Sequence, residues 1–164
     1  MFLLSALAVR PQPTRPMQPL MTGDMNMQVK SYLSFEGRCE EALDFYQKAL
    51  GAKVKEVMRF KDAPEQPSGD GCVAPMSGDK IMHSAFQIGE SELMATDGMN
   101  SGTPNFAGTS QALVVKTANE ADRYFQALAE GGQVMMPLAK TFFSEKFGMT
   151  TDRFGVPWMI VVMP

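Results

Sequence analysis

His83 is the only histidine of the 164-residue chain, and it lies in the segment KIMHSAF (80–86). If this segment is a strand, alternate side chains share a face. One face then carries Ile81, His83, Ala85 and Gln87. We expect the other face, with Met82, Phe86 and Ile88, to pack against a helix. His83 would then face a pocket as a hydrogen-bonding or acid–base group, because imidazole titrates near neutral pH. A structural, hydrogen-bonded histidine is an equally supported interpretation.

The chain has two cysteines, Cys39 and Cys72, which do not form a C-x-x-C pair. A disulfide scaffold, a zinc knuckle and a thioredoxin-type redox motif are therefore excluded. Two free thiols are typical of a reducing compartment, so we expect the protein to be cytoplasmic. Cys39 lies near the start of an expected helix, where a thiolate is stabilised. No base is placed near it in the sequence, so nucleophilic catalysis is not predicted.

The composition, with 45% hydrophobic and 20% charged residues, is that of a globular protein. The net charge of −3 offers no basic surface for nucleic acid or for an anionic membrane. The apolar run Phe2–Val9 is too short to span a bilayer. Arg10 and Arg15 follow this run, whereas a secretory signal has its positive charge in front. We expect residues 1–27 to be a disordered or extended segment outside the fold.

The segment EEALDFYQKALGAKV (41–55) predicts an amphipathic helix that ends at Gly51 and leads into a strand. The pattern recurs in the second half of the chain. A shift of 79 residues places Glu41 on Glu120 and Ala42 on Ala121. The second helix begins with Thr117 and Glu120 at the spacing of a capping box.

Alternating apolar residues predict strands around each helix. In the first half we expect strands at 29–35 and 52–60 and a hairpin that turns at Gly89–Glu90, with a long loop at 61–78. In the second half we expect strands at 109–115 and 133–142, with a bulge or sheet edge at Pro137, and a hairpin that turns at 154–157. Both halves therefore read strand, helix, strand, strand, strand, which indicates an internal repeat.

These elements predict an α+β fold of two βαβββ modules, residues 28–98 and 109–164, within one domain that covers 28–164. One helix covers one face of a four-stranded sheet, so the other face needs a partner or a ligand. Two modules side by side would form an eight-stranded, cup-shaped mixed sheet with the helices outside. The cup is where we expect a pocket.

Three stretches of the chain resemble a known family: YLSFEGRCEEALDFYQKALGA, IMHSAFQIGESELMATD and FGMTTDRFGVPWMIV. Together they are similar to the vicinal oxygen chelate superfamily, which includes glyoxalase I, extradiol dioxygenases and the bleomycin resistance proteins. The resemblance is strongest to its PhnB-like branch, whose members are often labelled 3-demethylubiquinone-9 3-methyltransferase. The sequence lacks a glycine-rich loop between a strand and a helix, so it does not itself indicate methyl transfer from a nucleotide-like cofactor.

The resemblance implies a divalent metal held by His, Glu or Gln side chains from four strands. Counting from the helices gives Ser31, Ser110, Met94 and Met159 for these positions. A slip of one residue gives Tyr32, Gln111, Leu93 and Trp158. Neither set suits a hard divalent ion, because thioethers are soft ligands and no carboxylate balances the charge. We therefore predict no metal and no other cofactor.

The prediction is a protein that binds a small organic molecule in a metal-free cup between the modules. The expected ligand-binding residues are Tyr32, His83, Met94, Gln111 and Trp158. The alternative is a glyoxalase- or dioxygenase-type enzyme, either metal-dependent or with His83 as its acid–base group. Because relatives commonly build the cup between two chains, the resemblance also implies a homodimer.

Overall fold

The computed structural model describes residues 27–63, 77–98 and 102–163. Cys72, most of the loop expected at 61–78 and all but the last residue of the segment 1–27 lie outside these ranges. The first module consists of β1 (Tyr32–Ser34), α1 (Cys39–Leu50), β2 (Lys53–Arg59), the short 3-10 helix η1 (Phe60–Asp62), β3 (Ile81–Ile88) and β4 (Ser91–Thr96). The second consists of β5 (Gln111–Val115), α2 (Ala118–Ala129), β6 (Gln133–Ala139), β7 (Phe147–Thr151) and β8 (Pro157–Val162). The α+β class and the internal repeat are confirmed.

The helices begin and end by different devices. Gly51 ends α1 in the left-handed conformation, with φ 66°, as expected of a glycine that follows a helix. Thr117 and Glu120 form the predicted capping box at the start of α2. The start of α1 has no such box, and Asp97 supplies the acceptor instead: its Oδ1 accepts the backbone N–H of Cys39 at 2.7 Å.

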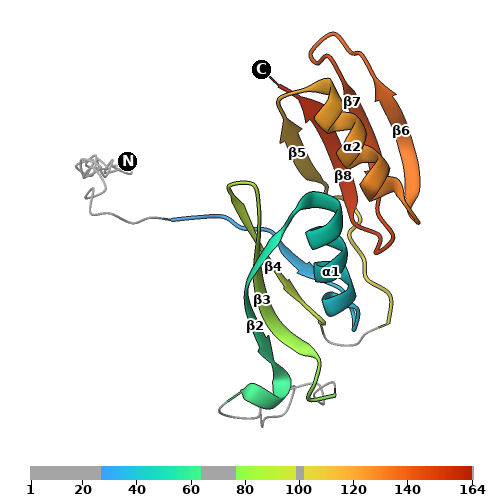
Figure 1. Ribbon diagram of the computed structural model, residues 1–164. Coiled ribbons are helices and arrows are strands. Elements are labelled where there is room, and N and C mark those ends of the chain that lie inside the picture. Colours follow the sequence, from blue (N-terminus) through green and yellow to red (C-terminus); the bar gives the residue numbers. More distant parts are fainter. Residues whose placement is uncertain (1–26, 64–76, 99–101, 164) are drawn as a thin grey trace, which may run out of the picture.

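The eight expected strands form two four-stranded sheets, with the orders β1-β4-β3-β2 and β5-β8-β7-β6. In each sheet the first strand runs parallel to the last, and the other neighbours are antiparallel. The modules follow one another along the long axis of the molecule, and α1 touches α2 (Figure 1). Ser31 Oγ donates to Gln111 Oε1 at 2.9 Å, which links the segment before β1 to the start of β5.

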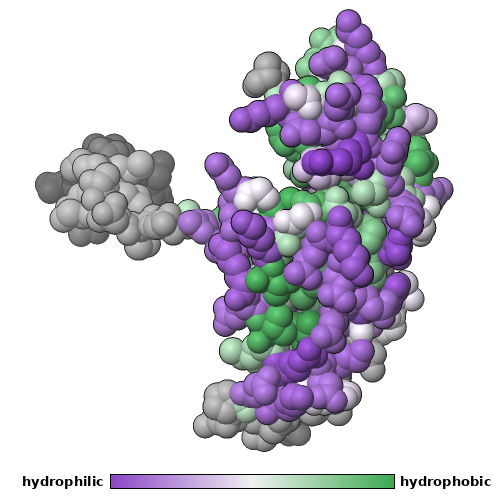
Figure 2. All heavy atoms as spheres, in the orientation of Figure 1, coloured by the Kyte–Doolittle hydropathy of each residue, from purple (hydrophilic) through white to green (hydrophobic). Residues whose placement is uncertain are grey.

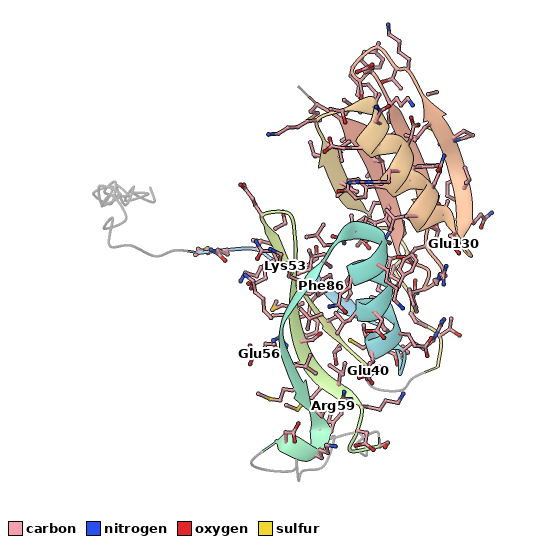
Figure 3. The ribbon with its side chains drawn as sticks, viewed as in Figure 1. Glu40, Lys53, Glu56, Arg59, Phe86 and Glu130 are labelled. Atoms are coloured by element: carbon pink, nitrogen blue, oxygen red, sulfur yellow. The ribbon has the colours of Figure 1, made fainter. Side chains whose placement is uncertain are left out.

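Each helix covers one face of its own sheet. Phe86 lies between the first sheet and α1 (Figure 3) and is fully buried. No described helix or strand covers the opposite face of either sheet, which we call the open face. On it, Tyr32 and Val114 are 50% and 56% exposed.

The face predicted for Ile81 is wrong. Ile81 pairs with Arg59 and His83 pairs with Met58, so a bulge at Met82 interrupts the alternation. Ile81 is therefore buried in the core, while His83 stays on the open face. The irregularity expected at Pro137 is confirmed, because the pairing of β6 with β7 shifts between Met136 and Ala139.

A buried carboxylate joins the two modules. Asp152 Oδ2 accepts the hydroxyl of Tyr46 on α1 at 2.7 Å and the indole N–H of Trp158 on β8 at 2.9 Å. Its Oδ1 accepts the backbone N–H groups of Phe154 and Val156, which close the turn before β8. All four donors thus converge on one side chain that is only 3% exposed.

Aromatic and cationic side chains surround this link. The ring of Phe154 packs against Phe35, Phe45 and Tyr46 of the first module. Arg38 lies 4.6 Å from the centre of the Phe154 ring, and Arg153 lies 4.6 Å from that of Phe45. Each module thus places an arginine on an aromatic ring of the other, which adds cation–π attraction to the burial of apolar surface.

We predict that Tyr46→Phe lowers the free energy of unfolding by about 1–3 kcal/mol, because it removes a buried donor from Asp152. Tyr124→Phe is the matched control, since among the described residues the hydroxyl of the partly buried Tyr124 on α2 hydrogen-bonds only to Arg123. It should change the free energy by less than about 0.5 kcal/mol. Urea denaturation checks both values, and equal effects of the two substitutions would contradict the role of Asp152.

The same pair of variants has a second readout at alkaline pH. Burial, with the charge of Asp152 beside it, raises the pKa of Tyr46 well above its ordinary value. The phenol therefore stays protonated in the folded protein, whereas in the unfolded chain it ionises near pH 10. This contribution to stability is complete below about pH 10 and is lost as the pH rises further. Tyr46→Phe should flatten that decline, and Tyr124→Phe should not.

Candidate functional site

Tyr32 and His83 meet on the open face of the first sheet. The Tyr32 hydroxyl lies 3.0 Å from His83 Nδ1, and the ring centres are 5.7 Å apart. The residues come from β1 and β3, which are separated by β4 in the sheet. Partial burial raises the pKa of the Tyr32 phenol, so the hydroxyl keeps its proton at neutral pH. With the phenol as donor, His83 accepts at Nδ1 and carries its own proton at Nε2.

The surroundings of this pair combine apolar and polar groups. Met94 lies opposite Tyr32 in the pairing of β1 with β4, and Met58 lies opposite His83. Towards the β3–β4 turn, Glu92 accepts from Lys30 and Lys55, and these hydrogen bonds lower the pKa of its carboxyl group. Glu56 points away from α1, as the open face requires (Figure 3). The first open face is therefore largely polar.

Gln111 and Trp158, the other two predicted ligand-binding residues, lie elsewhere. Both line a cleft of about 810 Å³ between the modules, beside β5 and the β3–β4 turn. Gln111 is tied to Ser31 there. Trp158 is 3% exposed and its N–H is engaged by Asp152, so its main contacts are with the core. The structure thus brings together Tyr32, His83 and Met94, but not these two residues.

The open face of the second sheet is largely apolar, which the sequence did not reveal. Apart from Gln133 and Thr151, its side chains are apolar: Ala112, Val114, Met136, Ala139, Phe147, Met149, Pro157, Met159 and Val161. Two register shifts in β6 hide the alternation that would have assigned Met136 to this face. The alternating pairs in β7 and β8 are the signal that could have found it.

The residues at the positions implied for a metal do not fit a divalent ion. Tyr32 pairs with Met94 on the first open face, and the corresponding pair on the second is Ala112 with Met159. Neither register considered from the sequence gives this set. The first has Ser31 and Ser110 in place of Tyr32 and Ala112, and the second has Leu93, Gln111 and Trp158 in place of Met94, Ala112 and Met159. One phenol and two thioethers offer no hard, charge-balancing donors. Among the described residues, no three His, Cys, Asp or Glu side chains come together.

Cys39 is buried at the start of α1, and its surroundings oppose a thiolate. Burial, followed by the charge of Asp97, raises the pKa of Cys39 to about 12, although the hydroxyl of Ser84 acts in the opposite direction. The two Asp97 oxygens accept the backbone N–H groups of Cys39 and Ile81 at 2.7 and 2.6 Å. Asp97 therefore caps the helix and ties it to β3.

The helix-covered side of the molecule is mostly hydrophilic, with an apolar patch beside α1 (Figure 2). A groove of about 350 Å³ lies there, and its apolar walls are Leu43, Val54, Val57 and Ile81. At its rim, Arg59 pairs with Glu40 at 2.6 Å. None of the predicted site residues lines this groove. No helix in the described part of the chain is long and apolar enough to cross a membrane.

A family model described as 3-demethylubiquinone-9 3-methyltransferase matches residues 27–161. Protein YjdN of Escherichia coli K12 is 36% identical over 141 residues, which is 84% of this chain and 96% of that protein. Protein PA1353 of Pseudomonas aeruginosa has a similar crystal structure, with TM-score 0.71 and 40% identity over 83% of this chain and 97% of its own.

The PhnB protein of Bacillus cereus is similar over 84% of this chain and all of its own, with TM-score 0.68 and 27% identity. A glyoxalase/bleomycin resistance protein from Albidiferax ferrireducens has TM-score 0.53 at 12% identity, which bears on the fold alone. The resemblance to the glyoxalase and bleomycin resistance proteins is thus confirmed for the fold.

We predict that native Cys39 reacts with a disulfide reagent at pH 8 at least about 100-fold more slowly than in denaturant, because a thiol with so high a pKa has little thiolate and this one is buried. The measurement uses Cys72→Ser, which leaves Cys39 as the only thiol. Reaction at the rate of a free cysteine would contradict the burial of Cys39.

Proposed function

The chain belongs to the 3-demethylubiquinone-9 3-methyltransferase family, of PhnB-like proteins with the glyoxalase fold, and on that basis we propose that it binds a small organic molecule on its open sheet faces without a metal ion. The family's name does not by itself assign methyl transfer. The described turns that lead into α1 and α2 are not the glycine-rich loops that hold nucleotide-like cofactors. We also place the protein in the cytoplasm, in keeping with its free Cys39.

The Tyr32–His83 pair is the observation that carries this proposal. It holds a phenol and an imidazole within hydrogen-bonding distance on a half-exposed sheet face. The second ring nitrogen, Nε2, remains able to bind a carbonyl, hydroxyl or carboxylate group of a ligand. Met94 and Met58 beside the pair offer adaptable apolar contacts. The ligand we expect has one polar group and an apolar body.

We propose further that a second copy of the chain completes the cup. The first open face is polar and the second is apolar, so the two faces complement each other as halves of a pocket for such a ligand. Val114 and Met136, 56% and 46% exposed, belong to an apolar sheet face that gains by being covered. In a homodimer with two-fold symmetry, the polar face of each chain can meet the apolar face of its partner.

A second candidate function is metal-independent acid–base catalysis by His83. The contact that favours it is again the one between the Tyr32 hydroxyl and His83 Nδ1, which orients the ring and, with the phenol as donor, leaves the imidazole proton on Nε2. An oriented imidazole with a free ring nitrogen can transfer protons to a bound molecule. The two candidate functions differ in one respect: a binding protein releases its ligand chemically unchanged, whereas an enzyme releases a product.

For this proposal we expect small phenols, hydroxyketones or carboxylic acids from a screening panel to raise the melting temperature and to shift the imidazole NMR signals of His83, the only histidine. Tyr32→Phe and His83→Gln should each weaken such a ligand about tenfold, the effect of one lost hydrogen bond. Tyr124→Phe is the matched control and should bind as the wild type does. Ligands unaffected by both site substitutions would contradict the proposal. If the wild-type protein converts a ligand into a product and His83→Gln does not, the second candidate, catalysis by His83, is correct.

The dimer has its own test in analytical ultracentrifugation. Val114→Asp places a charge on the second open face and should turn the dimer into a monomer. Val134→Asp is the matched control, because Val134 is similarly exposed but pairs with Thr150, whose side chain faces α2. The control variant should remain dimeric. A monomeric wild type, or dissociation by both substitutions, would contradict the arrangement.

A further inference from the structure

We propose that the open face of the second sheet carries a binding site for a soft monovalent metal ion, Cu(I), formed by the thioethers of Met136, Met149 and Met159. These residues lie in a row across three neighbouring strands. Met136 of β6 is paired with Met149 of β7, and Met149 is paired with Met159 of β8. Directly opposite residues of antiparallel strands have Cα atoms about 4.5–5.5 Å apart and side chains on one face.

The burial of the neighbouring residues shows which face these side chains occupy. Gly148 and Thr150, on either side of Met149, are buried on the side of α2, and Trp158 and Ile160, on either side of Met159, belong to the core. Met149 and Met159 therefore point to the open face, and Met136 shares it through its pairing. In the single chain Met136 is 46% exposed and the other two are partly exposed, so the three side chains lie at the surface of this face, which would line the cup in the proposed dimer.

The donor chemistry selects the ion. Thioethers are soft, neutral ligands that favour Cu(I) over Zn(II), Mg(II) or Mn(II). The described residues of this face include no carboxylate or imidazole, so nothing there balances a second positive charge. Methionine has three rotatable side-chain bonds. The two outer side chains can therefore lean over the central Met149 and bring three sulfurs to one ion.

An aromatic ring lies next to this row. Phe147 is two residues before Met149 on the same strand and face, and the Phe143 ring packs against it with ring centres 5.3 Å apart. The face of such a ring attracts a cation. Within one chain this site shares no residue with the Tyr32–His83 pair, which lies on the open face of the first sheet.

The test uses the full chain with Cys72→Ser, because a free thiol outside the described residues would compete for a soft ion. Ag(I) is the probe for Cu(I) in a chloride-free buffer, followed by calorimetry and by NMR of ¹³C-labelled methionine methyl groups. We expect the methyl signals of Met136, Met149 and Met159 to shift together as one equivalent binds. These methyl shifts are measured on the Cys72→Ser protein with all its methionines in place, so the result does not depend on whether a methionine variant folds.

The variants isolate the row. Met149→Leu keeps the volume of the side chain and should weaken Ag(I) at least tenfold, and the triple Leu variant should abolish this site. Met94→Leu is the matched control, since Met94 is a partly exposed open-face methionine whose paired neighbours, Tyr32 and Ala85, hold no sulfur. It should leave the affinity unchanged. Binding that survives in the triple variant, methyl shifts confined to other methionines, or equal weakening by Met94→Leu would overturn the proposal.

Discussion

Each module has one helix and one sheet, and a sheet has two faces. A helix can bury only the face on which it lies, so in the described part of the chain every module leaves one face without a helix over it. The inner faces of the two modules are alike, with small and apolar side chains that pack on α1 and α2. The outer faces differ, because no common packing partner constrains them. One carries Tyr32, His83 and Glu92, and the other carries Val114, Met136 and Met149. The two modules therefore share one architecture, but their open faces differ: the first is polar and the second is apolar.

The two modules also start their helices differently. In α2 the backbone N–H groups are satisfied locally by Thr117 and Glu120. In α1 the acceptor is Asp97, which comes 58 residues later in the chain and binds β3 with its other oxygen. A local capping box is visible in a sequence, because its spacing is fixed. A distant carboxylate such as Asp97 is not, because its position in the sequence does not indicate which helix it will contact.

Periodicity and caps predicted the elements well, because helix and strand patterns are local. The strands, both helices, the end of α1 at Gly51 and the hairpin at Gly89–Glu90 follow from short segments. The faces of irregular strands did not follow. A bulge at Met82 places Ile81 in the core instead of on the open face, and the register shifts in β6 conceal that Met136 lies on the second open face. Of the predicted site, the position of His83 on the open face came from alternation. Its contact with Tyr32, 51 residues away in the chain, required the folded sheet.

The buried Asp152 determines how the polar open face of the first module and the apolar open face of the second are placed relative to each other. Within one chain the polar face belongs to the first module and the apolar face to the second, and Tyr46 and Trp158 hold the modules together through this carboxylate. Removing one donor from a buried charged acceptor is costly, so the link resists sliding of one module on the other. In the proposed dimer each cup takes its halves from different chains. The link through Asp152 would then set the distance between the two cups. A dimer with two-fold symmetry forms both cups at once only if the link between the modules is rigid.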